Sequence, residues 1–208
     1  MGDLAVTITF GSERNADLLR SIHGIAAQLR SQDIPNVEDI VPSYLAISVY
    51  YDALRVSYDA MAKVLLSACA RGPTTPIGPM QAREHRIPVV YDGVDLDSVA
   101  DKTGLSRDEV IARHAGRAYT VDLLGFVPGF GYLSELDASL HLARREHPRA
   151  RVAAGSVAIA GSQTAVYPLD TPGGWHIIGR TGTRMFDPVR EPPSLLQPGD
   201  RVRFESVL

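Results

Sequence analysis

Residues 125–181 contain GFVPGFGYL at 125–133, ARREHPRAR at 143–151 and AAGSVAIAGSQTAVYPLDTPGGWHIIGRT at 153–181. Glycine gives a backbone access to positive φ, whereas proline fixes φ and removes a hydrogen-bond donor. Both are frequent here, and they predict rigid loops at the mouth of a β-structure, where binding and catalysis tend to sit. The same residues hold much of the chain's aromatic content, namely Phe126, Phe130, Tyr132, Tyr167 and Trp175.

The residues on either side predict a mainly β-structured C-terminal half. Many short strands separated by Gly/Pro turns are typical of a barrel or a sandwich. Ser106 followed three residues later by Glu109 predicts a capped helix start. The expected strands are 86–91, 119–127, 151–152, 156–160, 164–168, 175–179 and 201–207, and the expected helices are 96–103 and 106–114.

The N-terminal part predicts a small α+β unit. Its order is β-α-β-β-α, which favours two helices on one face of a small sheet. RGPTTPIGP at 71–79 cannot continue a helix or enter a central strand, and it predicts a domain boundary. We expect domains at 1–84 and 85–208. The expected strands are 4–10, 37–41 and 45–51, and the expected helices are one amphipathic segment from Leu18 to Leu29 and one at 52–71.

The composition of the 208 residues excludes several classes of protein. A hydrophobic content of 45% is enough for a sizeable core, and the net charge of −3 gives no basic face for a nucleic acid. The chain has one cysteine, and its histidines and cysteine lack the spacing of metal ligands. We see no signal peptide and no apolar run near the ~20 residues that span a bilayer. We expect a soluble cytoplasmic protein without a metal.

Two groups of side chains suggest a binding site, and each has a simpler interpretation. Phe126, Phe130 and Tyr132 can form an apolar pocket wall, but large aromatic residues more often complete a core. Arginines in the segment 143–151 match carboxylates and phosphates, but a charge run is more often a solvated loop.

The turns around GSVAIAGSQT at 155–164 are a third candidate. Their backbone N–H groups and the side chains of Ser156, Gln163 and Thr164 can hold an anion, although tight turns between strands explain them equally well. The Gly-Lys-Ser/Thr ending of a phosphate-binding loop is absent, and so is the Gly-x-Ser-x-Gly of a nucleophile elbow.

The strand predicted at 175–179 is the fourth candidate. Side chains alternate along a strand, so Trp175 and Ile177 should point one way and His176 and Ile178 the other. His176 can act as a general base or substrate donor, or it can be a structural histidine with its hydrogen bonds satisfied.

Taken together, these motifs resemble the bacterial family of the 5-oxoprolinase B subunit, which also includes proteins called allophanate hydrolase subunit 1 and the sporulation kinase A inhibitor. The resemblance rests on GFVPGFGYL, on residues 148–181, on FDPVREPPSLLQPGDRVRF at 186–204 and on VPSYLAISVYYDALRVSYD at 41–59. It implies an α+β protein in which a small N-terminal α/β sandwich domain precedes a cyclophilin-like β-barrel domain. Gly161-Ser-Gln163 and Val127-Pro-Gly-Phe130 also resemble motifs of cyclophilins.

The resemblance implies a subunit of an ATP-hydrolysing amidohydrolase that opens 5-oxo-L-proline to L-glutamate. ATP would be bound by the complex with A-like and C-like subunits, and the isolated chain would be inactive. The catalytic residues that it implies are Arg145, His176 and Arg180, because a lactam needs cations and donors around developing negative charge. The implied substrate-binding residues are Phe126, Phe130, Tyr132, Arg144, Ser156, Gln163, Thr164, Tyr167, Gly174 and Trp175.

Two other functions stay open at the level of the sequence. One is a sensor histidine kinase inhibitor that docks through its C-terminal domain, and the other is an allophanate hydrolase or urea carboxylase-type subunit. The chain also departs from the family pattern, which usually has Pro at Gly131 and Ala153 and a Gly-rich turn at Ser134–Glu135. These positions border the expected pocket, so they bear on which substrate is bound. A subunit that needs partners should also expose an apolar patch, which we expect near 126–133 or on the N-terminal sheet.

Overall fold

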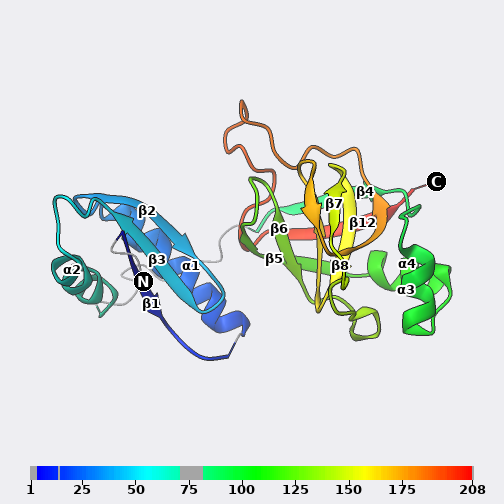
Figure 1. The fold of residues 1–208 in the computed structure, drawn as a ribbon, viewed down its shortest axis with the longest axis horizontal. Coiled ribbons are helices and arrows are strands. Elements are labelled where there is room, and N and C mark those ends of the chain that lie inside the picture. The colour runs from blue at the N-terminus through cyan, green and yellow to red at the C-terminus, as the bar shows by residue number, and fades with distance from the viewer. Residues whose placement is uncertain (1–3, 14, 71–81, 208) are drawn as a thin grey trace. The chain divides into compact units, whose positions relative to one another are not determined.

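A computed structural model describes residues 4–13, 15–70 and 82–207 of the chain. The chain divides into two compact units, Met1–Met80 and Gln81–Leu208 (Figure 1). The expected boundary segment RGPTTPIGP lies outside the described residues. A cut after residue 84 would pass through a strand that begins at Glu84, so independent folding of 1–84 and 85–208 stays a prediction.

The first unit has the predicted order of elements. They are β1 (Ala5–Thr9), α1 (Ala16–Ser31), β2 (Val37–Pro42), β3 (Ala46–Tyr51) and α2 (Tyr58–Ala70). The strands form an antiparallel sheet in the order β1-β3-β2. The Asn15 side chain accepts a hydrogen bond from the backbone N–H of Leu18 at 2.8 Å, which caps the start of α1.

One face of this sheet is buried under both helices. Alternate residues of β3, namely Ile47, Val49 and Tyr51, pack in one core cluster with residues of α1 and α2. The helical residues in this cluster are Ile22, Ala26 and Leu29 of α1 and Met61, Leu65 and Ala68 of α2. The period of two in the strand and of three to four in the helices thus selects the same buried face.

The second helix is shorter than the sequence suggested. It begins at Tyr58 rather than at Asp52. The Asp52 carboxylate accepts a hydrogen bond from the N–H of Leu54, and the Asp52 carbonyl accepts from the N–H groups of Arg55 and Val56. Aspartate competes in this way with helical hydrogen bonding, so residues 52–57 form a turn before the helix starts.

The second unit consists mainly of strands, with two helices near its start. Its elements are β4 (Glu84–Val89), α3 (Leu96–Thr103), α4 (Arg107–Ala115), β5 (Ala118–Leu124), β6 (Gly131–Ser134), η1 (Ala138–Leu140), β7 (Arg149–Val152), β8 (Ser156–Ala160), β9 (Gln163–Val166), β10 (Thr171–Gly173), β11 (His176–Arg180) and β12 (Arg201–Ser206). In Figure 1, α3 and α4 lie together at one end of the strands. The short strands β6 and β10 were not predicted.

A seven-stranded sheet forms the body of the described part of this unit. Its order is β11-β8-β9-β6-β5-β12-β4, with β12 and β4 parallel and the other pairs antiparallel. Val90, just after β4, exchanges two backbone hydrogen bonds of 2.9 Å with Arg180 at the end of β11. Because this pair joins the two edge strands, the sheet is nearly closed into a barrel, which is one of the two architectures, barrel or sandwich, that the many short strands predicted. None of the helices within the described segments is long and apolar enough to cross a membrane.

A buried histidine lies among the side chains inside the barrel. The hydroxyl of Thr164 donates to the carbonyl of Ala158 at 3.0 Å, so Nε2 of His114, 2.8 Å from that hydroxyl, is the donor to it. Nδ1 of His114 therefore accepts from the Tyr91 hydroxyl at 2.7 Å. The ring also stacks on Phe204 with a centroid distance of 4.7 Å. Burial lowers the pKa of His114 to about 3, so the imidazole stays neutral in the folded protein.

We expect His114 to destabilise the fold as the pH falls. The unfolded histidine, with a pKa of about 6.5, binds a proton below that pH, whereas the folded one does not until about pH 3. The contribution of neutral His114 to the free energy of unfolding is therefore fully present above about pH 6.5. It falls by about 2 kcal/mol between pH 7.5 and pH 5. Urea unfolding at both pH values measures it.

The matched control is His114→Phe, which keeps an aromatic ring against Phe204 but does not titrate. This variant should be less stable at neutral pH, because the Tyr91 hydroxyl loses its acceptor. Its stability should nevertheless change less than that of the wild type between pH 7.5 and pH 5. Equal pH dependence in the two proteins would show that His114 is not held neutral.

Candidate functional site

The outer face of the barrel differs from its interior in side-chain size. Along β8, Val157 and Ile159 lie in the interior cluster, whereas Ala158 and Ala160 lie in a second cluster on the opposite face. The small side chains leave room for large rings above them. Those rings belong to Phe126, Phe130, Tyr132, Tyr167 and Trp175, which we call the aromatic face.

Phe130 is the centre of the aromatic face. Its ring makes edge-to-face contacts with those of Phe126, Tyr132, Tyr167 and Trp175, at centroid distances of 5.4, 5.0, 5.3 and 5.6 Å. Phe130 is buried and completes a core, as the simpler interpretation of the sequence has it, and Trp175 is buried beside it. Phe126 is 58% exposed and adopts φ +69°, a left-handed conformation that costs a non-glycine residue energy and is more frequent at functional sites.

A positive charge lies beside the aromatic face. Burial raises the pKa of the Tyr132 and Tyr167 hydroxyls, and the charge of Arg144 partly offsets that shift for both. Arg144 is exposed, and no carboxylate among the described residues forms an ion pair with it. The accessible part of the face is thus a strained phenylalanine, a half-buried tyrosine and an unpaired arginine.

The neighbouring arginines bind a buried carboxylate instead. Asp95 immediately precedes α3, and its side chain is 4% exposed. Arg145 Nη1 lies 2.8 Å from Asp95 Oδ1, and Arg149 reaches both carboxylate oxygens at 2.7 and 2.9 Å. The backbone N–H of Ile177 donates to Oδ2 at 2.8 Å. One carboxylate therefore ties the start of α3 to residues 145–149, which lead into β7, and to β11.

The electrostatics of Asp95 agree with a structural role. Burial alone would raise the pKa of its carboxyl, but hydrogen bonds from Arg149 and Ile177 and the charges of Arg149 and Arg145 outweigh burial and lower it. Asp95 is therefore ionised at neutral pH, and both guanidinium groups have a charge partner. A catalytic role for Arg145 stays a prediction, and in the structure this residue belongs to the Asp95 ion pair.

The other expected catalytic residues lie away from the aromatic rings. His176 is 2% exposed, and its Nε2 donates to the carbonyl of Ala143 at 2.9 Å. It pairs with Ile159 of the interior cluster, whereas Trp175 belongs to the outer one, so the predicted alternation is confirmed. Arg180, at the far end of β11, pairs with Asp92 at 2.8 Å.

The expected polar contacts of the substrate also separate in space. Thr164 is fully buried and belongs to the His114 network of the interior. Ser156 is buried at the start of β8, and Gln163 is half-buried at the start of β9. The carbonyl of Gly174 accepts from the backbone N–H of Arg145 at 2.8 Å. The structure therefore gathers the aromatic residues and Arg144 but leaves His176, Arg180 and Thr164 apart from them.

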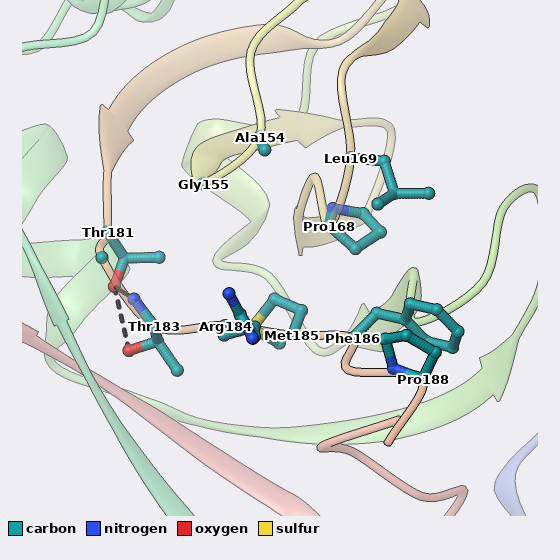
Figure 2. A pocket seen from close by; sticks show the side chains of 11 residues that line it. Ala154, Gly155, Pro168, Leu169, Thr181, Thr183, Arg184, Met185, Phe186 and Pro188 are labelled. Atoms are coloured by element: carbon teal, nitrogen blue, oxygen red, sulfur yellow. Dashed lines mark hydrogen bonds between the residues drawn. The ribbon is translucent and has the colours of Figure 1, made fainter. Parts of the chain in front are cut away.

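A pocket that the sequence did not reveal lies between three loop segments (Figure 2). Residues 154–155, 168–169 and 181–186 with Pro188 line it, and its volume is about 650 Å³. We call it the loop pocket. Of the described residues that line it, none belongs to the site expected from the sequence. In Figure 2 the hydroxyls of Thr181 and Thr183 lie on one side of the pocket, and Phe186 lies on the other.

The sequence holds weak signals for two features that it did not predict, the ion pairs of Asp95 and the loop pocket. An aspartate directly before an apolar helix start, as at Asp95, is a familiar helix-start residue, but nothing in the spacing identifies its arginine partners. The segment 186–199 is rich in proline, which is a signal for a loop, but nothing in the segment shows that part of it lines a pocket. Across the described segments, no three His, Cys, Asp or Glu side chains are grouped as metal ligands would be.

The chain is similar to proteins of one family along most of its length. A family model described as carboxyltransferase domain, subdomain C and D, matches residues 1–196. The chain is 37% identical to the 5-oxoprolinase B subunit of Bacillus subtilis (strain 168), over 98% of this chain and 90% of that protein. It is 44% identical to the protein of the same name from Escherichia coli O157:H7, over 84% of this chain and 80% of that protein.

Solved structures share the fold. The structure of TTHA0988 matches with a TM-score of 0.85 and 39% identity over 98% of this chain, which spans 40% of that longer chain. The urea carboxylase of Kluyveromyces lactis matches with a TM-score of 0.81 at 17% identity, over 99% of this chain and 21% of that one. This second likeness concerns the fold alone.

Asp95→Asn should lower the free energy of unfolding by about 3 kcal/mol, because two half-buried guanidinium groups lose their charge partner. Asp170→Asn is the matched control, since it removes the carboxylate of the exposed Arg151–Asp170 pair and should lower the free energy of unfolding much less, because solvent screens a surface pair. Urea unfolding at neutral pH compares the two variants. Equal losses would mean that the Asp95 pairs contribute no more than a surface ion pair.

Proposed function

The chain belongs to the carboxyltransferase-domain family, subdomain C and D, and on that basis we propose that it is the B subunit of an ATP-dependent 5-oxoprolinase. Together with A-like and C-like subunits it would open 5-oxo-L-proline to L-glutamate. The observation that carries the proposal is the likeness to a 5-oxoprolinase B subunit along almost the whole of both chains. The relatives are named as one subunit of 5-oxoprolinase, which supports a complex. We therefore expect the isolated chain to be inactive.

The chemistry of the reaction sets what the complex has to supply. A lactam carbonyl is a weak electrophile because its nitrogen donates electrons to it, and negative charge develops on its oxygen as water adds. Cationic and N–H or O–H donors near that oxygen lower the barrier. In this chain Arg184 and Thr183 of the loop pocket offer such donors, and Arg144 offers a free guanidinium beside the aromatic face.

Nucleotide binding does not fit the loop pocket of this chain. Arg184 is the cation among the described residues that line it, and no carboxylate lines it. A magnesium–triphosphate group needs several donors around its phosphates and oxygen ligands for the metal. We therefore place ATP on the assembled complex and assign no nucleotide-binding residue to this chain.

The accessible part of the aromatic face supports contact with another subunit. Phe126 is exposed although it is a large apolar residue, and Arg144 has no ion-pair partner among the described residues. Aromatic and arginine side chains are over-represented among the residues that carry most of the binding energy of interfaces. We propose that these two residues touch a partner, or the substrate held between the partner and this chain.

The proposal predicts glutamate release only from the complete complex. The chain should be co-expressed with an A-like and a C-like subunit from one bacterium, and glutamate and ADP should be measured with 5-oxo-L-proline and ATP. Omitting any subunit should remove activity. Urea with bicarbonate in place of 5-oxo-L-proline tests the urea carboxylase-type alternative. A complete complex that releases no glutamate above its incomplete mixtures would exclude this function.

Phe126→Ala and Arg144→Ala should each weaken assembly or turnover about tenfold, which is the usual loss for a residue that contributes strongly to an interface. Val94→Ala is the control, because Val94 is 75% exposed in the same unit but lies outside the aromatic face. Analytical ultracentrifugation with the partner subunits and the glutamate assay give the two readouts. Unchanged values for both variants would leave the aromatic face as core packing only.

A further inference from the structure

We propose that the loop pocket binds the carboxylate of a small organic acid through the guanidinium of Arg184, with the apolar part of the acid on the pocket floor. The choice of acid rests on the proposed function, since 5-oxo-L-proline joins one carboxylate to a five-membered lactam ring. Beyond the proposed function, the inference names where on this chain the acid binds, which residue recognises its charge, and which class of ligand fits.

The floor of the pocket is apolar and of suitable size. Met185 is buried, Phe186 is half-buried, and Pro168, Leu169 and Pro188 complete the lining (Figure 2). The volume of about 650 Å³ lies within the range of roughly 300–1,000 Å³ that is typical of small-molecule sites. A ring of a few carbon atoms gains binding free energy when its apolar surface is buried against these side chains. A highly charged ligand gains no such free energy from them.

A hydroxyl pair leaves a hydrogen-bond donor on the polar side. The Thr181 hydroxyl donates to Thr183 Oγ1 at 3.1 Å and accepts from the backbone N–H of Thr183 at 3.1 Å. The oxygen of Thr183 is thereby used as an acceptor, and its own hydrogen is available for a ligand. A ligand oxygen, such as that of a carboxylate or a lactam carbonyl, is the group that this hydrogen fits.

Arg184 supplies the positive charge at the rim. Its Nη1 pairs with Asp187 at 3.1 Å, and its side chain is 73% exposed, so most of its five N–H donors remain free. The pKa of Asp187 is lowered first by the N–H of Val189, then by Arg184 and also by Arg190. Because Asp187 has these other partners, a ligand carboxylate can bind Arg184 without leaving Asp187 uncompensated.

The walls of the pocket are fixed before any ligand arrives. Arg190 donates to the carbonyls of Met185 and Pro193 at 3.2 and 2.9 Å, which holds the loop that carries Arg184. On the opposite wall, the Asp170 carboxylate accepts from the N–H of Ala154 at 2.8 Å. A preformed site loses less conformational entropy on binding than a mobile one.

Gly155 joins the two walls. Its carbonyl accepts from the N–H of Thr181 at 2.8 Å, and its φ is +82°. A Cβ at this position would lie 2.4 Å from the carbonyl oxygen of Thr181. A side chain here would therefore push the walls apart, so the pocket depends on a glycine at this position.

Methionine methyl signals test the site in the full chain without ATP or partners. Met185 lies in the pocket, whereas Met61 lies in the core of the other unit and serves as an internal control. We expect 5-oxo-L-proline and cyclopentanecarboxylate to shift the Met185 methyl signal and to leave Met61 unchanged. Neutral 2-pyrrolidinone, which keeps the lactam but lacks the carboxylate, should bind at least tenfold more weakly.

Two variants separate charge recognition from the fold. Arg184→Met should weaken binding of both carboxylates at least tenfold, whereas Arg86→Met should not, since Arg86 is a similarly exposed, ion-paired arginine on β4, away from the pocket lining. Thermal unfolding of both variants checks that each of them folds. The inference is overturned if Arg184→Met binds as the wild type does, if 2-pyrrolidinone binds as well as the acids, or if neither acid shifts the Met185 signal.

The binding test of the loop pocket and the glutamate assay of the proposed function can fail independently of each other. Binding to the isolated chain with no glutamate release from the complete complex would exclude the enzyme and leave the carboxylate site standing. An active complex in which this chain shows no shift at Met185 would exclude the site and leave the enzyme standing.

Discussion

The buried carboxylate of Asp95 is the interaction on which the arrangement of the second unit's outer loops depends. A buried charge is tolerated only when it is paired and hydrogen-bonded, and Asp95 obtains its partners from three separate places in the chain. Two are the guanidinium groups of Arg145 and Arg149, and the third is the backbone N–H of Ile177. The segment between η1 and β7 therefore cannot move away from α3 and β11 without exposing uncompensated charges.

This constraint explains why adjacent arginines have different roles. Arg145 and Arg149 are turned inward to Asp95, and the residue between the η1 segment and this pair, Arg144, is left exposed beside the hydroxyls of Tyr132 and Tyr167. The four arginines of a cluster that looks uniform in sequence thus differ: Arg145 and Arg149 bind the buried Asp95, Arg151 pairs with the exposed Asp170, and Arg144 is left available. The available one is exposed beside the rings of the aromatic face.

The barrel strands separate two packed clusters by the size of their alternate side chains. Valine and isoleucine of β8 fill the interior, and alanines on its outer face admit the aromatic rings. The interior also isolates His114, whose two nitrogens are both satisfied. The loop pocket shares Met185 with the interior cluster, but loops rather than strands set its shape, and loops of this kind are where binding residues commonly lie on a rigid scaffold.

The sequence by itself determined the α+β class, the order of elements in the first unit, the many short strands of the second, and the opposite directions of Trp175 and His176. These follow from local periodicity and turn residues, which act over a few neighbouring positions. Only the tertiary structure decided that Arg145 binds Asp95, that Thr164 belongs to the interior and that Arg184 borders a pocket. Each of these depends on a partner tens of residues away or on the closure of the sheet, and no local pattern encodes a contact over that separation.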